Sequence, residues 1–138
     1  MKKIIVILLF AAAVATSTIT AHAQIVIAST DVKASEISKS DLTDIFSGAS
    51  SMLGRSHVMP VLLKTGTVNG EFLSAYIGKS DLAFRTGWRS LVFSGQATMP
   101  RSFDSEAAAV DYVAHNPGTI AYIGKGAPHE GVKVIAIK

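Results

Sequence analysis

The stretch that decides the fold reads PVLLKTGTVNGEFL and spans residues 60–73. Residues 61–63 form a short apolar run of the kind found in buried strands. Residues 65–70 are rich in Gly, Thr and Asn, as turns are. From Phe72 onward, apolar residues recur at helical spacing as far as Ile77. The pattern therefore predicts a strand, a polar turn and a helix.

This turn is also the candidate binding site. A helix that begins after a turn leaves backbone N–H groups unpaired beside the positive end of its dipole, which is a common way to hold an anion. We therefore predict an oxyanion site formed by backbone N–H groups, hydroxyls and one ammonium group. The alternative is an ordinary helix start, capped by Thr67 or Asn69. The residues predicted to bind the oxyanion are Lys64, Thr65, Gly66, Thr67, Asn69 and Gly70.

The first 23 residues have the pattern of a secretory signal peptide. Two lysines precede an apolar run, and Ala21 and Ala23 place small residues at the positions that determine cleavage. We predict cleavage after Ala23, a mature domain over residues 24–138 and a periplasmic location. The alternative is a membrane anchor, but a spanning helix needs about 20 predominantly apolar residues and this run is shorter.

Composition limits the classes of function. The chain has 138 residues, with 13 Lys and Arg against 10 Asp and Glu, and no cysteine. Two lysines lie in the predicted signal peptide, so the basic excess falls from 3 to 1 after cleavage, and we expect no nucleic-acid partner. Without cysteine there is no disulfide, thiolate chemistry or lipid-bearing cysteine. We expect one domain held by its apolar core, with no membrane anchor after cleavage.

The rest of the chain alternates strand and helix patterns. Such alternation is typical of an α/β domain with a mixed sheet flanked by helices. Ligands of such sheets bind at the carboxyl ends of strands, where the predicted turn would lie. Predicted strands span 25–28, 58–63, 119–123 and 132–137, and the other helices begin near Ser38 or Ser40, Ser80 or Asp81, and Asp104 or Ser105.

Helical spacing also predicts the buried faces. We expect Leu42, Ile45 and Phe46 to be buried in the first helix, Phe84, Trp88, Leu91 and Val92 in the third, and Ala107, Val110, Val113 and Ala114 in the last.

Other polar residues give no catalytic or metal-binding pattern. The histidines that remain after cleavage, at 57, 115 and 129, lack a metal-ligand spacing, and no G-x-S-x-G elbow is present. We therefore predict no enzyme activity, no catalytic residue, no metal and no cofactor. Arg85, Arg89 and Arg101 form either a basic patch or, as we favour, a solvated helix face.

Several short motifs are similar to those of one protein family. IFSG at 45–48 resembles an "IF-x-G" signature, TGT at 65–67 resembles an "SGT" loop followed by a phenylalanine at Phe72, and FSG at 93–95 with Pro100 resembles a segment of short relatives. NPGTIAYI at 116–123 resembles a C-terminal "pGaIGYv" segment. Together these segments resemble the phosphate-binding protein-like family of the type 2 periplasmic binding fold, over nearly the whole mature chain.

The resemblance covers only the second of the two lobes of such proteins. Thr65 stands where the family has serine, and the arginine expected before the loop is missing, with Val61 near its place and Lys64 closer to the loop. The tryptophan expected after the first motif is absent from residues 49–54. The arginine matters because its planar fork binds an oxyanion with two hydrogen bonds, which lysine cannot do.

The resemblance implies a periplasmic solute-binding-like protein, related to binding of phosphate or another small oxyanion for ABC-type transport. Its implied partners are the oxyanion and an ABC permease. The alternative is a single-lobe protein-interaction module of the cell envelope with no small-molecule ligand. Such a module would dock on another envelope protein or on itself as a dimer.

Overall fold

The computed structural model describes residues 24–138, and the predicted signal peptide lies outside the described residues. The order of elements confirms the predicted α/β class with a mixed sheet and flanking helices. In chain order the elements are β1 (Gln24–Ala28), β2 (Glu36–Ile37), α1 (Lys39–Ser47), β3 (Met52–Leu53), β4 (Ser56–His57), β5 (Met59–Pro60), β6 (Leu62–Leu63), α2 (Thr67–Phe72), the π-helical turn η1 (Leu73–Ile77), α3 (Asp81–Phe93), β7 (Ser102–Phe103), α4 (Glu106–His115), β8 (Thr119–Gly124) and β9 (Lys133–Ile137).

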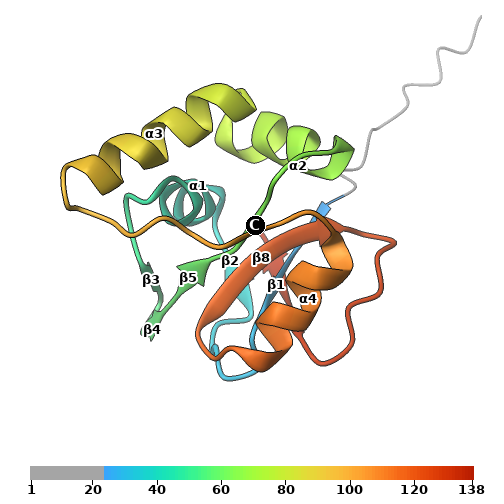
Figure 1. The fold of residues 1–138 in the computed structure, drawn as a ribbon. Coiled ribbons are helices and arrows are strands. Elements are labelled where there is room, and N and C mark those ends of the chain that lie inside the picture. The colour runs from blue at the N-terminus through green and yellow to red at the C-terminus, as the bar shows by residue number, and fades with distance from the viewer. Residues whose placement is uncertain (1–23) are drawn as a thin grey trace, which may run out of the picture.

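The main sheet has the strand order β2-β9-β1-β8-β5. β1 runs antiparallel to both neighbours, whereas β5 is parallel to β8 and β2 is parallel to β9. The apolar, β-branched sequence of β1 suits this central place, since Val26, Ile27 and Ala28 are fully buried. Figure 1 shows α4 in front of the sheet and α1, α2 and α3 grouped together on another side of it, where α1 and α2 contact its strands.

The segment that leads into the turn bonds to two different partners. The Val61 N–H donates to the Ile120 carbonyl at 2.7 Å, whereas the Leu62 N–H donates to the Arg101 carbonyl at 2.9 Å. This alternation follows from strand geometry, because successive backbone groups point to opposite sides. Pro60 lies in β5, the edge strand of the main sheet, where a residue without a backbone N–H is tolerated.

Capping residues set the predicted helix boundaries. Ser38, Ser80 and Ser105 each precede a helix, and each hydroxyl accepts a hydrogen bond from the backbone N–H three residues later. Gly48 ends α1 in the left-handed conformation, with φ 82°, as glycines that follow a helix often do.

An aromatic cluster joins the helices to the sheet. The rings of Phe72 in α2 and Tyr122 in β8 are stacked, with centroids 3.9 Å apart. Phe46 of α1 meets both rings edge-on, at 5.3 and 5.5 Å. All three side chains are fully or almost fully buried. This cluster holds the first helix after the turn directly over a central strand.

Two predicted buried faces are partly wrong. Ala107 and Ala114 are exposed in α4, where Ala109 is buried beside the correctly predicted Val110 and Val113. Alanine fits either environment because its side chain is small, so spacing alone did not choose among the three alanines. In α3, Phe84 and Trp88 are buried as expected, whereas Leu91 is only half-buried.

The other error in α3 is Val92, which is 39 % exposed. The next residue, Phe93, is 93 % exposed. The last turn of α3 therefore presents apolar side chains to solvent instead of to the core.

Three stretches outside the predicted strands and helices contain two-residue strands. β2 pairs with β9, β3 pairs with β4, and β7 pairs with β6. Pieces of two residues are too short to show alternation in the sequence, so their pairing depends on partners that lie elsewhere in the chain. A further difference is η1. The helix after the turn ends at Gly78 as predicted, but its last turn is π-helical instead of α-helical.

Candidate functional site

The strand, turn and helix predicted from residues 60–73 are present as β6, a turn and α2. We refer to residues 64–70 as the 64–70 turn. Gly66 precedes α2 with φ 105° and ψ 171°, a conformation that glycine adopts readily and other residues do not. The Gly70 N–H donates to the Gly66 carbonyl at 3.0 Å, which closes the first helical turn.

No side chain caps the start of α2. The alternative of a helix capped by Thr67 or Asn69 is therefore wrong. The hydroxyls of Thr65 and Thr67 make no hydrogen bond within the described part of the chain, and both residues are exposed. The turn consequently has two exposed hydroxyls without protein partners beside a helix start that no side chain caps.

Lys64 supplies the positive charge of the exposed part of this turn. We call this exposed part the rim; it consists of Lys64, Thr65, Gly66, Thr67 and Gly70. Its Nζ lies 3.6 Å from Asp104 Oδ2, and the two side chains are 51 % and 83 % exposed. An ion pair this exposed holds the lysine only weakly. Gly66 and Gly70 are exposed as well. The structure thus brings five of the six predicted site residues to one solvent-facing turn.

Asn69, the sixth predicted residue, points inward. It is 2 % exposed. Its Nδ2 donates to Asp81 Oδ1 at 3.0 Å, and its Oδ1 accepts a hydrogen bond from the Tyr122 hydroxyl at 2.5 Å. Both ends of the amide are therefore bonded to protein groups. The side chain of Asn69 supports the turn from below and is not part of its exposed rim.

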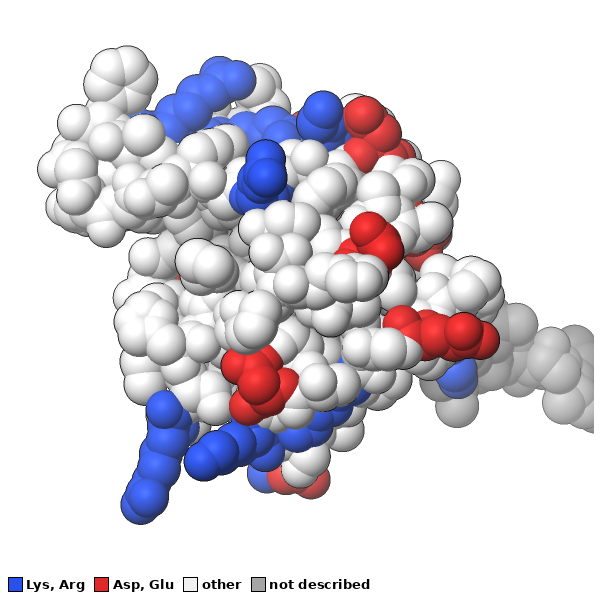
Figure 2. Space-filling model, turned by 60° about the horizontal axis from the view of Figure 1, so that its bottom comes forward, with Lys and Arg blue, Asp and Glu red and all other residues white. Residues whose placement is uncertain are grey.

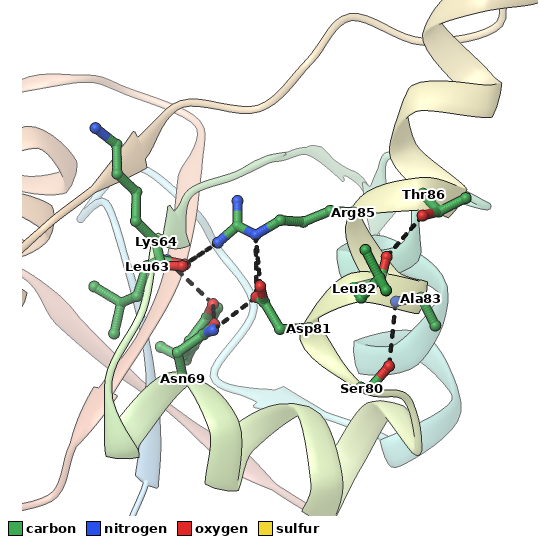
Figure 3. A network of polar contacts seen from close by, with 10 residues as sticks. Leu63, Lys64, Asn69, Ser80, Asp81, Leu82, Ala83, Arg85 and Thr86 are labelled. Carbon is green, nitrogen blue, oxygen red and sulfur yellow. Dashed lines mark hydrogen bonds and ion pairs between the residues drawn. The ribbon is translucent and has the colours of Figure 1, made fainter.

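These residues belong to a closed polar network. The Tyr122 hydroxyl accepts the Leu63 N–H at 3.1 Å. Arg85 Nε contacts both carboxylate oxygens of Asp81, at 3.1 and 2.9 Å, and its Nη2 donates to the carbonyls of Leu63 and Lys64. Figure 3 shows the network, with the Lys64 ammonium and one guanidinium nitrogen of Arg85 pointing away from it.

The network changes the acidity of two members. Burial alone would raise the pKa of Asp81, but hydrogen bonds from Arg85 and Asn69 and the charge of Arg85 hold that pKa below its usual value. Burial raises the pKa of Tyr122 to about 12, although the Leu63 N–H and the charge of Arg85 act in the opposite direction. Asp81 therefore remains ionised, and Tyr122 remains a hydrogen-bond donor, at neutral pH.

Sequence reasoning missed the roles of Arg85, Asp81 and Tyr122. Arg85 is not part of a freely solvated face, because it binds Asp81 and two carbonyls at the end of β6. The spacing of Asp81 and Arg85, four residues apart in a helix, could have indicated their pairing. Asn69 lies three residues before the buried Phe72, on the same face of the helix, which could have indicated its burial.

Other site types are not found in the described residues. Within residues 24–138, no group of three or more His, Asp or Glu side chains could hold a metal ion. None of the helices in that range is long and apolar enough to cross a membrane.

Comparisons with known proteins find matches in structure only. No protein-family model and no curated protein matches the sequence. The structure is similar to an ABC-type phosphate transport receptor from Vibrio cholerae, with a TM-score of 0.65 and 15 % identity, over 83 % of this chain and 46 % of the receptor. The fold is that of part of a phosphate receptor.

Two further structures share this receptor fold. A Clostridium perfringens protein whose structure contains bound phosphate matches with a TM-score of 0.63 and 13 % identity, over 83 % of this chain and 44 % of its own. PstS from Borrelia burgdorferi matches with a TM-score of 0.54 and 14 % identity, over 84 % of this chain and 47 % of its own. The chain spans less than half the length of each, in agreement with the predicted resemblance to a single lobe.

Proposed function

We propose that this protein is a solute-binding-like protein that binds phosphate or a related small oxyanion at the 64–70 turn. The observation that carries the proposal is the exposed rim of this turn. One ammonium group and two hydroxyls without protein partners are exposed at a helix start that no side chain caps. Groups of these kinds bind oxyanions at helix starts. The shared fold with phosphate receptors supports the same assignment.

Arg85 adds to this rim from a direction that the sequence did not suggest. The arginine expected in the strand before the turn is missing, but Arg85 reaches the end of β6 from α3. Its Nη1 makes no hydrogen bond within the described residues, and Figure 3 shows one guanidinium nitrogen directed out of the network. We include Arg85 Nη1 among the oxyanion donors. Asp81 offsets much of its charge, so Lys64 is the main source of attraction.

The proposal extends to location and partners. The mature protein, residues 24–138, acts in the periplasm after cleavage at Ala23 and delivers its oxyanion to an ABC permease. A turn on one surface leaves the far side of a bound oxyanion in water, where each hydrogen bond contributes only ~1 kcal/mol. We propose that a second copy of the chain or another envelope protein covers that side.

The test is isothermal titration of inorganic phosphate into the mature protein, with Lys64→Ala and Thr67→Ala as site variants. Lys33→Ala is the matched control, because Lys33 is an exposed lysine in the loop between β1 and β2, and its backbone N–H donates to Ser56 of β4 and not to the turn. We expect saturable binding that both site variants weaken and the control preserves. No heat at millimolar phosphate, or equal weakening by all three variants, would refute the proposal.

A second candidate function is docking to another protein without a small ligand. The observation that favours it is the apolar surface of α3, where Leu82 is 73 % exposed and Phe93 is 93 % exposed. Sedimentation of the wild type and of the Leu82→Ser, Phe93→Ser double variant tests self-association. A wild type that dimerises and a variant that remains monomeric would support docking. Identical monomers at all concentrations would exclude the homodimer.

A further inference from the structure

A groove separate from the 64–70 turn lies beside β5. It has a volume of about 620 Å³ and is bounded by the end of α1, by β5 and by the loop of residues 96–101. None of the residues of the turn lines it. Pockets for small organic ligands occupy roughly 300–1,000 Å³, so the groove has the size of such a site.

Backbone hydrogen bonds hold the walls of the groove in place. At one end of the 96–101 loop, the Gln96 N–H donates to the Leu91 carbonyl at 2.9 Å. At the other end, the Leu62 N–H donates to the Arg101 carbonyl at 2.9 Å. On the opposite wall, the Ala49 N–H donates to the Asp44 carbonyl at 2.8 Å. The groove therefore exists before any ligand binds, which lowers the entropic cost of binding.

The interior of the groove is largely apolar. Trp88 contributes its ring, and the indole Nε1 is fixed by a 2.9 Å hydrogen bond to the Phe46 carbonyl. Pro60, Val61, Met99 and Tyr112 add further apolar surface. Flat rings and flexible methionine side chains suit a ligand with an apolar body.

The charge of the groove is positive. Arg101 is the lining residue that is always charged, and none of the residues that line the groove is Asp or Glu. Arg101 forms no ion pair within the described part of the chain, and its guanidinium lies 5.5 Å from the centroid of the Tyr112 ring. The cation is thus held over an aromatic ring of the same groove while its hydrogen-bond donors are unused.

The uncharged surroundings are visible from outside. The end of α3 and strands β3 to β5 lie on the left in Figure 1, and the corresponding side of the space-filling view in Figure 2 is largely free of charged side chains. A single arginine in such surroundings attracts one negative group and favours an apolar remainder.

We propose that the groove binds a small organic carboxylic acid with an aromatic or branched apolar body. The carboxylate pairs with the planar guanidinium of Arg101, and the apolar body packs on Trp88 and Met99. Inorganic phosphate does not fit this description, because it has no apolar part. The site is therefore independent of the oxyanion site proposed at the turn.

The test uses 4-phenylbutyrate as the acidic probe and 4-phenylbutyramide as its neutral analogue. Trp88 is the single tryptophan of the chain, so its fluorescence and its indole N–H signal in NMR report directly on the groove. We expect both probes to shift the Trp88 signal saturably, with the acid binding about tenfold tighter because of its pairing with Arg101. Inorganic phosphate should leave the Trp88 signal unchanged.

Two arginine variants make this test specific. Arg101→Gln should reduce the affinity for the acid to that for the amide and leave the amide unaffected. Arg89→Gln is the matched control, since Arg89 is an exposed arginine that does not line the groove. No Trp88 response at millimolar 4-phenylbutyrate, or a preference for the acid that survives Arg101→Gln, would overturn the proposal. So would an equal response to phosphate.

Discussion

The 64–70 turn is polar and open to solvent, whereas the groove beside β5 is largely apolar and concave. The turn rests on a network of polar residues bonded to one another, of which Asn69 and Tyr122 are buried, so its rim keeps its shape but excludes little water. The groove has fewer polar groups but can bury an apolar ligand, which contributes about 25 cal/mol for each Å² removed from water. One chain thus carries two surfaces that select different ligands, and variants can separate them.

The largest expected effect comes from breaking the network under the turn. Asn69→Leu leaves the buried Tyr122 hydroxyl without an acceptor and removes one donor from Asp81, which keeps Arg85. An unsatisfied buried group costs about 1–3 kcal/mol, so we expect a loss of up to about 3 kcal/mol in the free energy of unfolding. Urea denaturation measures this free energy, and Thr98→Ala, a substitution in the groove and away from the network, is the control. The folded Asn69→Leu variant should bind 4-phenylbutyrate with the affinity of the wild type. A stability within 0.5 kcal/mol of wild type would contradict the network's role.

The next effect is a loss of stability at alkaline pH, which concerns the network under the turn and not the groove. The unfolded chain loses the Tyr122 proton near the ordinary pKa of about 10, whereas the folded chain keeps it to about 12. The stabilising contribution is therefore complete below pH 10 and falls between pH 10 and 12, by up to about 3 kcal/mol.

Tyr122→Phe isolates this contribution from that of other groups. The variant should be less stable than wild type at pH 8, because the Leu63 N–H and Asn69 lose a partner. The difference should shrink between pH 10 and 12 in denaturation curves. A constant difference across that range would contradict the raised pKa.

Alanine substitutions of the two glycines of the turn should change the stability less, and in opposite directions. Gly66→Ala places a Cβ at φ 105° and should destabilise the protein by about 1–3 kcal/mol. Gly70→Ala lies inside α2 with no atom within 4 Å of the new Cβ, and should stabilise by up to ~1 kcal/mol. Thermal unfolding of the pair measures both. The same sign for both variants would contradict the assigned backbone conformations.

The smallest expected effect on stability is that of Lys64→Ala. Exposed ion pairs contribute little, so the free energy of unfolding should change by less than about 0.5 kcal/mol. Phosphate binding, in contrast, should weaken clearly. If the loss of binding were accompanied by an equal loss of stability, Lys64 would be a structural residue and not a ligand contact.

Local signals in the sequence predicted much of the fold. Ser38 and Ser80 fix helix starts, and Gly48 a helix end, through bonds within a few residues, so the pattern contains what is needed. The strand, turn and helix of residues 60–73 followed from periodicity alone. The exposed rim of the site was predictable for the same reason, since it depends on one short stretch.

The remainder depends on contacts between distant segments. Asn69 faces inward because its amide binds Tyr122 and Asp81. Both partners lie outside the sequence of the turn. Arg85 donates a hydrogen bond to Leu63 of β6, which lies 22 residues earlier in the chain. No local sequence pattern predicts a bond between residues so far apart. The groove combines α1, β5, α3 and α4, so its apolar character emerges only when these elements pack.

The π-helical turn η1 makes the network sensitive to the number of residues and not only to their type. The Gly78 N–H donates to the Leu73 carbonyl at 2.7 Å, five residues back, so this turn holds one residue more than an α-helical turn. Removing that residue, for example exposed Ser74, leaves an α-helical turn in which the Gly78 N–H still meets the Leu73 carbonyl, whereas adding a residue rotates the following chain by about 100°. Asp81 would then leave its place beside Asn69. A deletion of one residue in this segment is therefore tolerable where an insertion is not.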